Sequence, residues 1–303
     1  MKKVRIKTSK DGKVQPALFY VPADATTDKD AWHVPLVVGL HTWGTNYRNH
    51  VARQYLAQCR KRGWSLIHPD FRGPNTRPEA CASELAVQDV LDAVQYAFRK
   101  AHIDERRIYL VGVSGGGHMV MMMASKAPKL WAAASAWVGI SDLAAWHEET
   151  KTAGNKYWRM VEKVCGGPPG TSAQVDMQYR KRSPLFGLHT TAGLPIDINA
   201  GIRDGHTGSV PISQSLRAFN ALARANGRGR KILSDTQIDF MTQRQEVPAD
   251  LTHRQQDEPP RRHKVLFRRQ AGPARVTIFK GGHEIDVKTA FDWMATRSRQ
   301  PKS

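Results

Sequence analysis

The strongest constraint on the fold is the order in which apolar runs and helical patterns follow one another along the chain. Continuous apolar runs such as 34–40 are typical of strands that are buried on both faces, as the central strands of a parallel sheet are. Helical spacing follows most of them, as in the amphipathic segment 83–102. The predicted strands are 34–40, 64–68, 107–113, 130–138, 196–201 and 274–279, and the predicted helices are 51–62, 83–102, 115–127, 209–225 and one after Glu284. This repeated β-α-β order predicts an α/β fold with a mostly parallel central sheet and helices on both faces.

Three segments depart from this alternation. Two alternating runs, 4–8 and 17–21, flank the turn signal at 11–12 and predict an antiparallel hairpin at the start of the sheet. The segment 143–191 is rich in Trp, Lys and Arg, and we interpret it as an inserted, partly helical cap. The segment 227–270 is polar and basic, and we interpret it as a solvated excursion. Residues 1–303 are therefore predicted to form a single domain that carries a cap.

The overall composition excludes several classes of protein. No apolar run approaches the roughly 18 to 20 residues of a membrane span, and residues 1–5 lack the apolar core of a secretory signal. We therefore expect no membrane contact and a cytoplasmic protein, or a secreted one if a leader has been removed. The three cysteines Cys59, Cys81 and Cys165 have neither an even number nor CxxC spacing, so they predict neither a disulfide framework nor a zinc site.

A catalytic serine is indicated by the sequence GVSGG at 112–116, which has the pattern G-x-S-x-G. The motif alone is weak evidence, but here it joins a predicted buried strand to a predicted helix. A sharp turn at that point exposes the hydroxyl of Ser114 above the edge of the sheet, and the small neighbours Gly112 and Gly116 permit the turn. We therefore predict that Ser114 is a nucleophile.

A serine nucleophile needs a base, and the base needs an acid that orients it. Asp204 follows a predicted buried strand, and His283 follows the last predicted strand in a glycine-containing loop. The order Ser, Asp, His is the one that this fold requires. Ser114, Asp204 and His283 are therefore the predicted triad. Three alternatives remain open at this stage, namely Asp197 as the acid, His206 as a pocket residue and His118 as a second histidine near the turn.

Acyl transfer also needs two hydrogen-bond donors for the oxyanion. One donor should be the backbone N–H of Gly115, the residue after the nucleophile. The second normally comes from the loop after the first central strand, here 41–44, and we predict the residue Trp43.

With these residues in view, the chain resembles the prolyl oligopeptidase family of α/β-hydrolases, in a single-domain, esterase-like branch similar to acetyl xylan and feruloyl esterases. The most specific stretches are GVSGG at 112–116, DGH at 204–206 and GGH at 281–283, within a resemblance that covers about 36–293. The resemblance implies the same triad and the same oxyanion donors. The sequence departs from the family at His41-Thr42, where such enzymes usually have His-Gly, and it has no room for a β-propeller before the catalytic segment.

These observations predict a serine hydrolase that cleaves short-chain carboxylic esters, including carbohydrate-linked acetyl or feruloyl esters. The chemistry requires no metal and no organic cofactor. The cap aromatics Trp146, Tyr157 and Trp158 would either line the substrate pocket or form the core of the cap. A serine peptidase of the same family is the main alternative function.

A third function class, a polyanion-binding protein on a hydrolase fold, is supported by the net charge of +19 alone. The basic residues are scattered and no nucleic-acid module is recognisable, which disfavours nucleic acid as a partner. The positive field instead either draws an anionic ester substrate or aids solubility. The sequence does not predict the oligomeric state.

Overall fold

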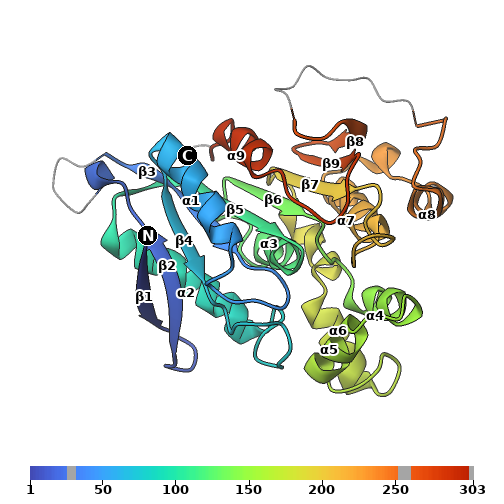
Figure 1. Ribbon diagram of the computed structural model, residues 1–303, viewed down its shortest axis with the longest axis horizontal. Helices are drawn as coiled ribbons and strands as arrows, with labels where there is room; N and C mark the ends of the chain where they lie inside the picture. Colours follow the sequence, from blue (N-terminus) through green and yellow to red (C-terminus); the bar gives the residue numbers. More distant parts are fainter. Residues whose placement is uncertain (26–31, 252–260, 300–303) are drawn as a thin grey trace.

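A computed structural model of the 303-residue chain describes residues 1–25, 32–251 and 261–299. Within these residues one nine-stranded sheet runs in the order β1-β2-β4-β3-β5-β6-β7-β9-β8 (Figure 1). The strands from β4 to β9 in this order are mutually parallel. β2 and β8 run against their neighbours, and β1 pairs with β2 at the edge. The mostly parallel sheet that the sequence predicts is therefore confirmed.

The elements have the following bounds. The strands are β1 Lys2–Lys7, β2 Val14–Tyr20, β3 Val34–Leu40, β4 Ser65–Pro69, β5 Ile103–Val113, β6 Ala133–Trp137, β7 Ile196–Gly201, β8 Val265–Ala271 and β9 Ala274–Phe279. The helices are α1 Val51–Arg62, α2 Glu84–Lys100, α3 Gly115–Lys126, α4 Leu143–Thr152, α5 Tyr157–Cys165, α6 Ala173–Arg182, α7 Ile212–Ala225, α8 Asp235–Arg244 and α9 Val287–Ala295. No helix in the described ranges is both long and apolar enough to cross a membrane.

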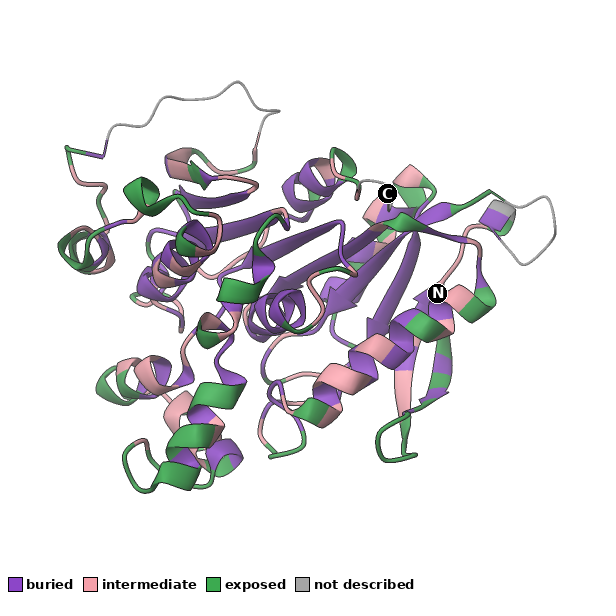
Figure 2. Ribbon diagram, turned by 180° about the vertical axis from the view of Figure 1, so that it is seen from behind, coloured by how far each residue is buried: buried purple, intermediate pink, exposed green. Residues whose placement is uncertain are grey.

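Helices cover both faces of the sheet because its central strands are apolar on both sides. Every residue of β3, β4, β6, β7 and β9 is buried, and Figure 2 shows these strands as a continuous buried layer. Helices α1 and α9 pack together on one face, and α2, α3 and α7 contact the strands from the other. Burial of apolar area on this scale is the main favourable term in folding.

Most predicted elements are present with small changes in their bounds. The helix predicted at 51–62 and the strands at 34–40, 196–201 and 274–279 are confirmed. β5 is longer than predicted because its first residues, which include charged ones, still pair with β3 at Val34. β6 is shorter, since the chain turns at 127–132 before it joins the sheet. Helix α7 begins at Ile212 and not at Ser209, because Pro211 occupies its N-cap.

The prediction that 227–270 is a solvated excursion is wrong for much of the segment. Helix α8 begins with a capping box between Ser234 and Gln237 and buries Ile238 and Met241. β8 adds an antiparallel strand to the sheet edge and buries Phe267 among basic residues. Residues 252–260, also within the predicted excursion, lie outside the described ranges.

The segment 143–191 forms the helices α4, α5 and α6 and two short 3₁₀ turns, Pro184–Phe186 and Leu188–Thr191. These helices stand beside the sheet at the lower right of Figure 1. Their apolar side chains form a core cluster that also takes in Trp43 and Val210 from the main body. The buried Arg182 of α6 donates hydrogen bonds to the backbone carbonyls of Pro78 and Ala80. These contacts fix α6 to the loop after β4.

Glycines permit a very close approach of backbones at the start of α3. A Cβ placed on Gly112 would lie 2.4 Å from the carbonyl carbon and oxygen of Gly116. A Cβ on Gly116 would lie 2.4 Å from the carbonyl oxygen of Leu40. Both distances are far below van der Waals contact, so β3, β5 and α3 can pack in this way only if these positions lack side chains.

We predict that Gly112→Ala lowers the free energy of unfolding by about 3 kcal/mol, because a rigid backbone segment and not a flexible side chain would have to move. Gly229→Ala is the matched control, since a Cβ there meets no atom within 4 Å, and its effect should stay within about 0.5 kcal/mol. Denaturant titrations of both variants provide the measurement. Equal stability of the two variants would contradict the packing described for Gly112.

Candidate active site

The turn that carries Ser114 lies between β5 and α3 and is strained. Ser114 has φ 60° and ψ −123°, a region that residues with a side chain rarely adopt and that costs of order 1–3 kcal/mol. The surrounding structure holds it there, because the Ser114 N–H donates to the Trp137 carbonyl of β6 at 2.9 Å. Strain of this kind is typical of a nucleophile elbow. The geometry therefore sets the hydroxyl at the carboxyl edge of the sheet.

The acid and the base that the sequence predicts are in direct contact. His283 Nδ1 donates to Asp204 Oδ2 at 2.7 Å, although the two residues lie 79 positions apart in the chain. Asp204 is fully buried, and its Oδ1 accepts from the N–H groups of Gly205 and Val210 at 2.9 and 3.1 Å. These bonds orient the carboxylate toward the imidazole. They also place the ring proton on Nδ1 and leave Nε2 as the acceptor of the ring.

Ser114 and His283 line the same cavity, which has a volume of about 410 Å³. The hydrogen bond that the general-base hypothesis predicts between them is absent in this structure, where the hydroxyl of Ser114 has no partner among the described residues. Such bonds are often long in the free state of an enzyme, and rotation of the short serine side chain moves its hydroxyl. The predicted nucleophile and base therefore line one cavity but are not hydrogen-bonded to each other.

The two predicted oxyanion donors lie side by side. A Cβ placed on Gly115 would lie 2.5 Å from the backbone nitrogen of Trp43, so the two main chains are in contact at this point. The N–H of Gly115 begins α3, where backbone donors have no intrahelical partner. Neither N–H donates a hydrogen bond within the described part of the chain. Both are therefore available to an oxygen that carries negative charge.

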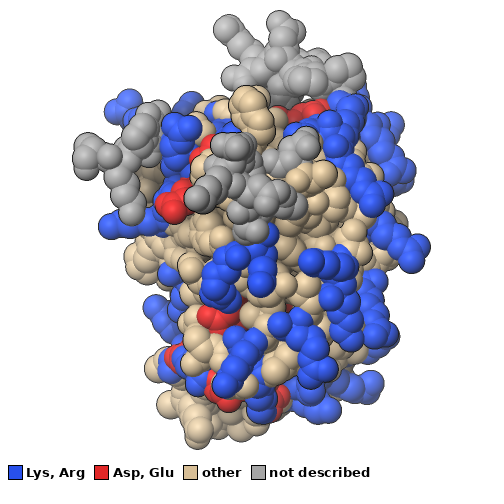
Figure 3. All heavy atoms as spheres, turned by 90° about the vertical axis from the view of Figure 1, so that its left-hand side faces the viewer, with Lys and Arg blue, Asp and Glu red and all other residues tan. Residues whose placement is uncertain are grey.

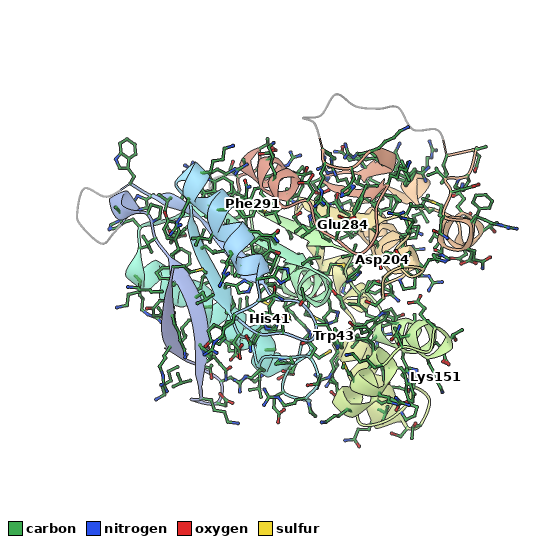
Figure 4. The ribbon with its side chains drawn as sticks, viewed as in Figure 1. His41, Trp43, Lys151, Asp204, Glu284 and Phe291 are labelled. Carbon is green, nitrogen blue, oxygen red and sulfur yellow. The ribbon has the colours of Figure 1, made fainter. Side chains whose placement is uncertain are left out.

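The loop that positions Trp43 is held by His41, at the point where the sequence departs from the family pattern. The buried His41 donates from Nε2 to the Asp70 carbonyl at 2.7 Å and stacks on Phe71 with ring centroids 3.9 Å apart. The Trp43 carbonyl accepts from the Asn75 N–H at 2.8 Å. The loop thus lies against 70–75, and Thr42 in place of glycine is compatible with this conformation. Figure 4 shows Trp43 between the sheet and α4–α6, and Trp43 lines the same cavity as Glu284.

The alternative acid, Asp197, has a structural partner instead. It is fully buried near the start of β7, as the second residue of the strand, and accepts from Arg275 Nε of β9 at 2.6 Å. Burial by itself would raise the pKa of Asp197, but the Arg275 guanidinium beside it outweighs this effect and the pKa lies below its usual value. The Asp197 carboxylate thus links β7 to β9 and does not contact His283.

The two alternative histidines also lie outside the cavity. His206 is exposed and donates from Nε2 to the Thr242 carbonyl of α8 at 2.6 Å, so the hypothesis that it lines the pocket is wrong. His118 is fully buried in α3, and its Nδ1 donates to the Ile140 carbonyl at 3.0 Å. Burial lowers the pKa of His118 to about 4, which makes it a weak base.

The aromatic residues of 143–191 divide between the two roles that the sequence leaves open. Tyr157, at the start of α5, lines the cavity. Trp146 is buried in the cluster behind Trp43, with ring centroids 4.7 Å apart, and Trp158 packs against the cations of Lys151 and Arg159. Of the three aromatics, Tyr157 alone contributes to the cavity wall.

Sequence reasoning misses several residues that line the cavity. His50 and Gln54 come from the start of α1, and Arg262 and Glu284 flank the loop of the predicted base. Glu284 could have been suspected from its place next to His283. Arg262 could not, because it lies in the segment that the composition marks as a solvated excursion.

The fold and the arrangement of these residues define an α/β-hydrolase. A model of the prolyl oligopeptidase family matches residues 52–247, which is more than half of the chain. The chain therefore belongs to the prolyl oligopeptidase family, as the sequence motifs predict. A comparison with curated proteins found no match.

Solved structures of α/β-hydrolases resemble this one over most of the chain. An acetyl xylan esterase from Paenibacillus sp. R4 is similar with a TM-score of 0.65 and 13% identity, over 97% of this chain and 83% of the esterase. An acylaminoacyl peptidase from Pyrococcus horikoshii is similar with a TM-score of 0.58 and 19% identity, over 74% of this chain and 35% of the peptidase. A puromycin hydrolase matches 97% of this chain with a TM-score of 0.62 and 16% identity.

The chain thus spans little more than a third of the length of the peptidase and the puromycin hydrolase that it resembles, whose matched shares are 35% and 37%. At these identities the similarity shows a shared fold.

We predict that Asp204→Asn lowers turnover by about 10⁴ while the protein stays folded, because the amide would favour the imidazole tautomer that cannot accept a proton from Ser114. Asp197→Asn should instead keep most activity and lose roughly 3 kcal/mol of stability, since it weakens a buried ion pair with Arg275. The measurement combines turnover of one acetyl ester with thermal melts of both variants. A folded, nearly fully active Asp204→Asn protein would remove Asp204 from the triad.

Proposed function

We propose that this protein is a serine hydrolase of short-chain carboxylic esters, with Ser114 as nucleophile, His283 as general base and Asp204 as the orienting acid. The observation that carries the proposal is the 2.7 Å contact of Asp204 with His283 at the wall of a cavity that Ser114 also lines. These three residues come from distant parts of the sequence, and they follow one another along the chain in the order Ser, Asp, His that is typical of α/β-hydrolases.

The reaction would proceed through an acyl-enzyme. Ser114 Oγ attacks the ester carbonyl carbon while its proton passes to His283 Nε2, and the carbonyl oxygen takes the negative charge. The N–H groups of Gly115 and Trp43 stabilise this oxyanion, a contribution of several kcal/mol when the donors are preorganised. The imidazolium then gives its proton to the leaving alcohol oxygen. Water then attacks the acyl carbon while its proton passes to His283, the bond to Ser114 Oγ breaks, and Oγ takes the proton back as the carboxylic acid leaves.

Two observations favour a short acyl group. The cavity of about 410 Å³ lies at the small end of the usual range for ligand sites and must hold both parts of the ester. Of the three similar structures named above, the acetyl xylan esterase is also the one that this chain covers most fully, at 83% of its length. A peptidase activity is the second candidate, because the family model and the acylaminoacyl peptidase structure are compatible with it.

We expect the wild-type protein to hydrolyse p-nitrophenyl acetate and Ser114→Ala to lose this activity by roughly 10⁴ or more. His283→Ala should lose a similar share of the activity. His189→Ala, which removes an exposed histidine that does not line the cavity, should keep the wild-type activity. Steady-state kinetics on the four proteins gives the answer. Equal activity in Ser114→Ala and the wild type would refute the proposed nucleophile.

A panel of acyl groups tests the substrate class. We predict that kcat/KM falls from acetyl to dodecanoyl p-nitrophenyl esters, because the cavity cannot enclose a long chain. Acetyl esters should also be cleaved faster than aminoacyl p-nitroanilides. A rise toward dodecanoyl would contradict the short-acyl assignment, and faster cleavage of the anilides would favour the peptidase candidate.

A further inference from the structure

The cavity beside Ser114 contains a cation that the ester chemistry described above does not use. Arg262 lines the cavity together with Ser114 and His283, and its side chain is 68% exposed. Its backbone N–H donates to Asp286 Oδ2 at 3.0 Å, and Asp286 is the N-cap of α9. The main chain at Arg262 is therefore anchored next to the loop that carries the base, while its side chain lines the cavity and stays largely exposed.

Glu284 is the acid nearest to Arg262 in the cavity, and its carboxylate is already engaged. It accepts from His263 Nε2 at 3.0 Å and from the Gly282 N–H at 3.3 Å. The distance from Glu284 Oε2 to Arg262 is 3.9 Å, beyond a direct hydrogen bond. Among the described residues, this long contact with Glu284 is the only ion pair of the Arg262 side chain. Most of the five donors of the guanidinium can therefore serve a ligand.

The position of Arg262 indicates which part of the ester it would contact. A general acid must reach the leaving oxygen, so the alcohol part of the ester lies over His283 in acyl transfer. Glu284 directly follows His283, and Arg262 is paired with Glu284. Arg262 is therefore expected beside the alcohol part, whereas Gly115 and Trp43 mark the side of the carbonyl oxygen.

The charge of the whole protein supports an anionic ligand. Lys and Arg exceed Asp and Glu by 19, and Figure 3 shows one face on which basic side chains far outnumber acidic ones. Exposed residues of the edge strand β1, including Lys3, Arg5 and Lys7, contribute to this excess. A field of this sign raises the local concentration of anions and their rate of association.

We propose that Arg262 binds a carboxylate carried by the alcohol part of the ester, so that the natural substrate is a short-chain ester of an acidic sugar unit or of another hydroxy acid. Planar guanidinium and carboxylate groups match in a bidentate arrangement, which gives such a site geometric specificity. The inference rests on the proposed ester hydrolysis. It adds the chemical class of the alcohol to that function.

A matched pair of acetyl esters tests the proposal, namely 3-acetoxybenzoate and 3-acetoxybenzamide, which differ in the charge of the alcohol part. Arg262→Gln should lower kcat/KM for the benzoate about tenfold and change it less than twofold for the benzamide. The control is Arg99→Gln, which removes an exposed arginine of α2 that does not line the cavity and should change neither value. The preference of the wild type for the benzoate should also weaken as ionic strength rises.

Two further substrates test whether Arg262 recognises a carboxylate on the acyl part of the ester instead of on the alcohol part. For mono-p-nitrophenyl succinate and p-nitrophenyl butyrate, which differ in the acyl part, Arg262→Gln should have equal effects. Selective loss on the succinate, or equal loss on benzoate and benzamide, would overturn the proposal. Absence of any hydrolysis by the wild type would instead be a failure of the proposed function, so the two failures are distinguishable.

To identify the natural source of the carboxylate, acetate release is measured from an acetylated polyuronate and from the acetylated uronic acid monomer. Release from either one that depends on Arg262 supports the proposal, and the preferred substrate identifies the source. Release from neither would exclude an acidic sugar unit and assign the carboxylate to another hydroxy acid, provided that cleavage of 3-acetoxybenzoate depends on Arg262. Without that dependence the proposal is overturned.

Discussion

The site depends on the close contact between the turn at Ser114 and the loop that follows β3. The backbones of Gly115 and Trp43 approach so closely that a methyl group on Gly115 would overlap the nitrogen of Trp43. This contact sets two N–H groups next to each other at the start of α3, where the helix dipole also favours negative charge. It exists because β3 and β5 are neighbours in the sheet, with Leu40 level with Gly112. The parallel register thus sets the distance between the nucleophile and both proposed oxyanion donors.

The second half of the site uses the same edge of the sheet. β7 and β9 are adjacent and parallel, so the loops that carry Asp204 and His283 leave the sheet side by side. Small residues again allow the approach, since a Cβ on Gly208 would lie 2.3 Å from Asp204 Oδ1 and 2.6 Å from His283 Cβ. The backbone N–H of Arg203 donates to the Gly281 carbonyl at 3.1 Å, which joins the two loops directly. The hydrogen bond between Asp204 and His283 therefore forms between two loops that are joined to each other.

The sequence predicts the central sheet and the residues of the site because both depend on short-range patterns. A strand such as β7 is a continuous apolar run, and the strand ends mark where Ser114, Asp204 and His283 must lie. The strand β8 is missed because it lies at the edge, where Arg268 and Arg269 are tolerated beside the buried Phe267. Helix α8 is missed although the pair Ser234 and Gln237 is a recognisable capping box. The place of Arg262 in the cavity and the separation of Ser114 from His283 depend on tertiary packing, which periodicity does not report.

The proposed chemistry depends most directly on whether Ser114 is the activated nucleophile. A fluorophosphonate reacts covalently with a serine whose hydroxyl transfers its proton to a base, and mass spectrometry of the digested protein locates the adduct. We predict one adduct, on Ser114, that is lost in His283→Ala and slowed in Asp204→Asn while both variants remain folded. Labelling of another serine, or labelling of Ser114 that does not depend on His283, would contradict it.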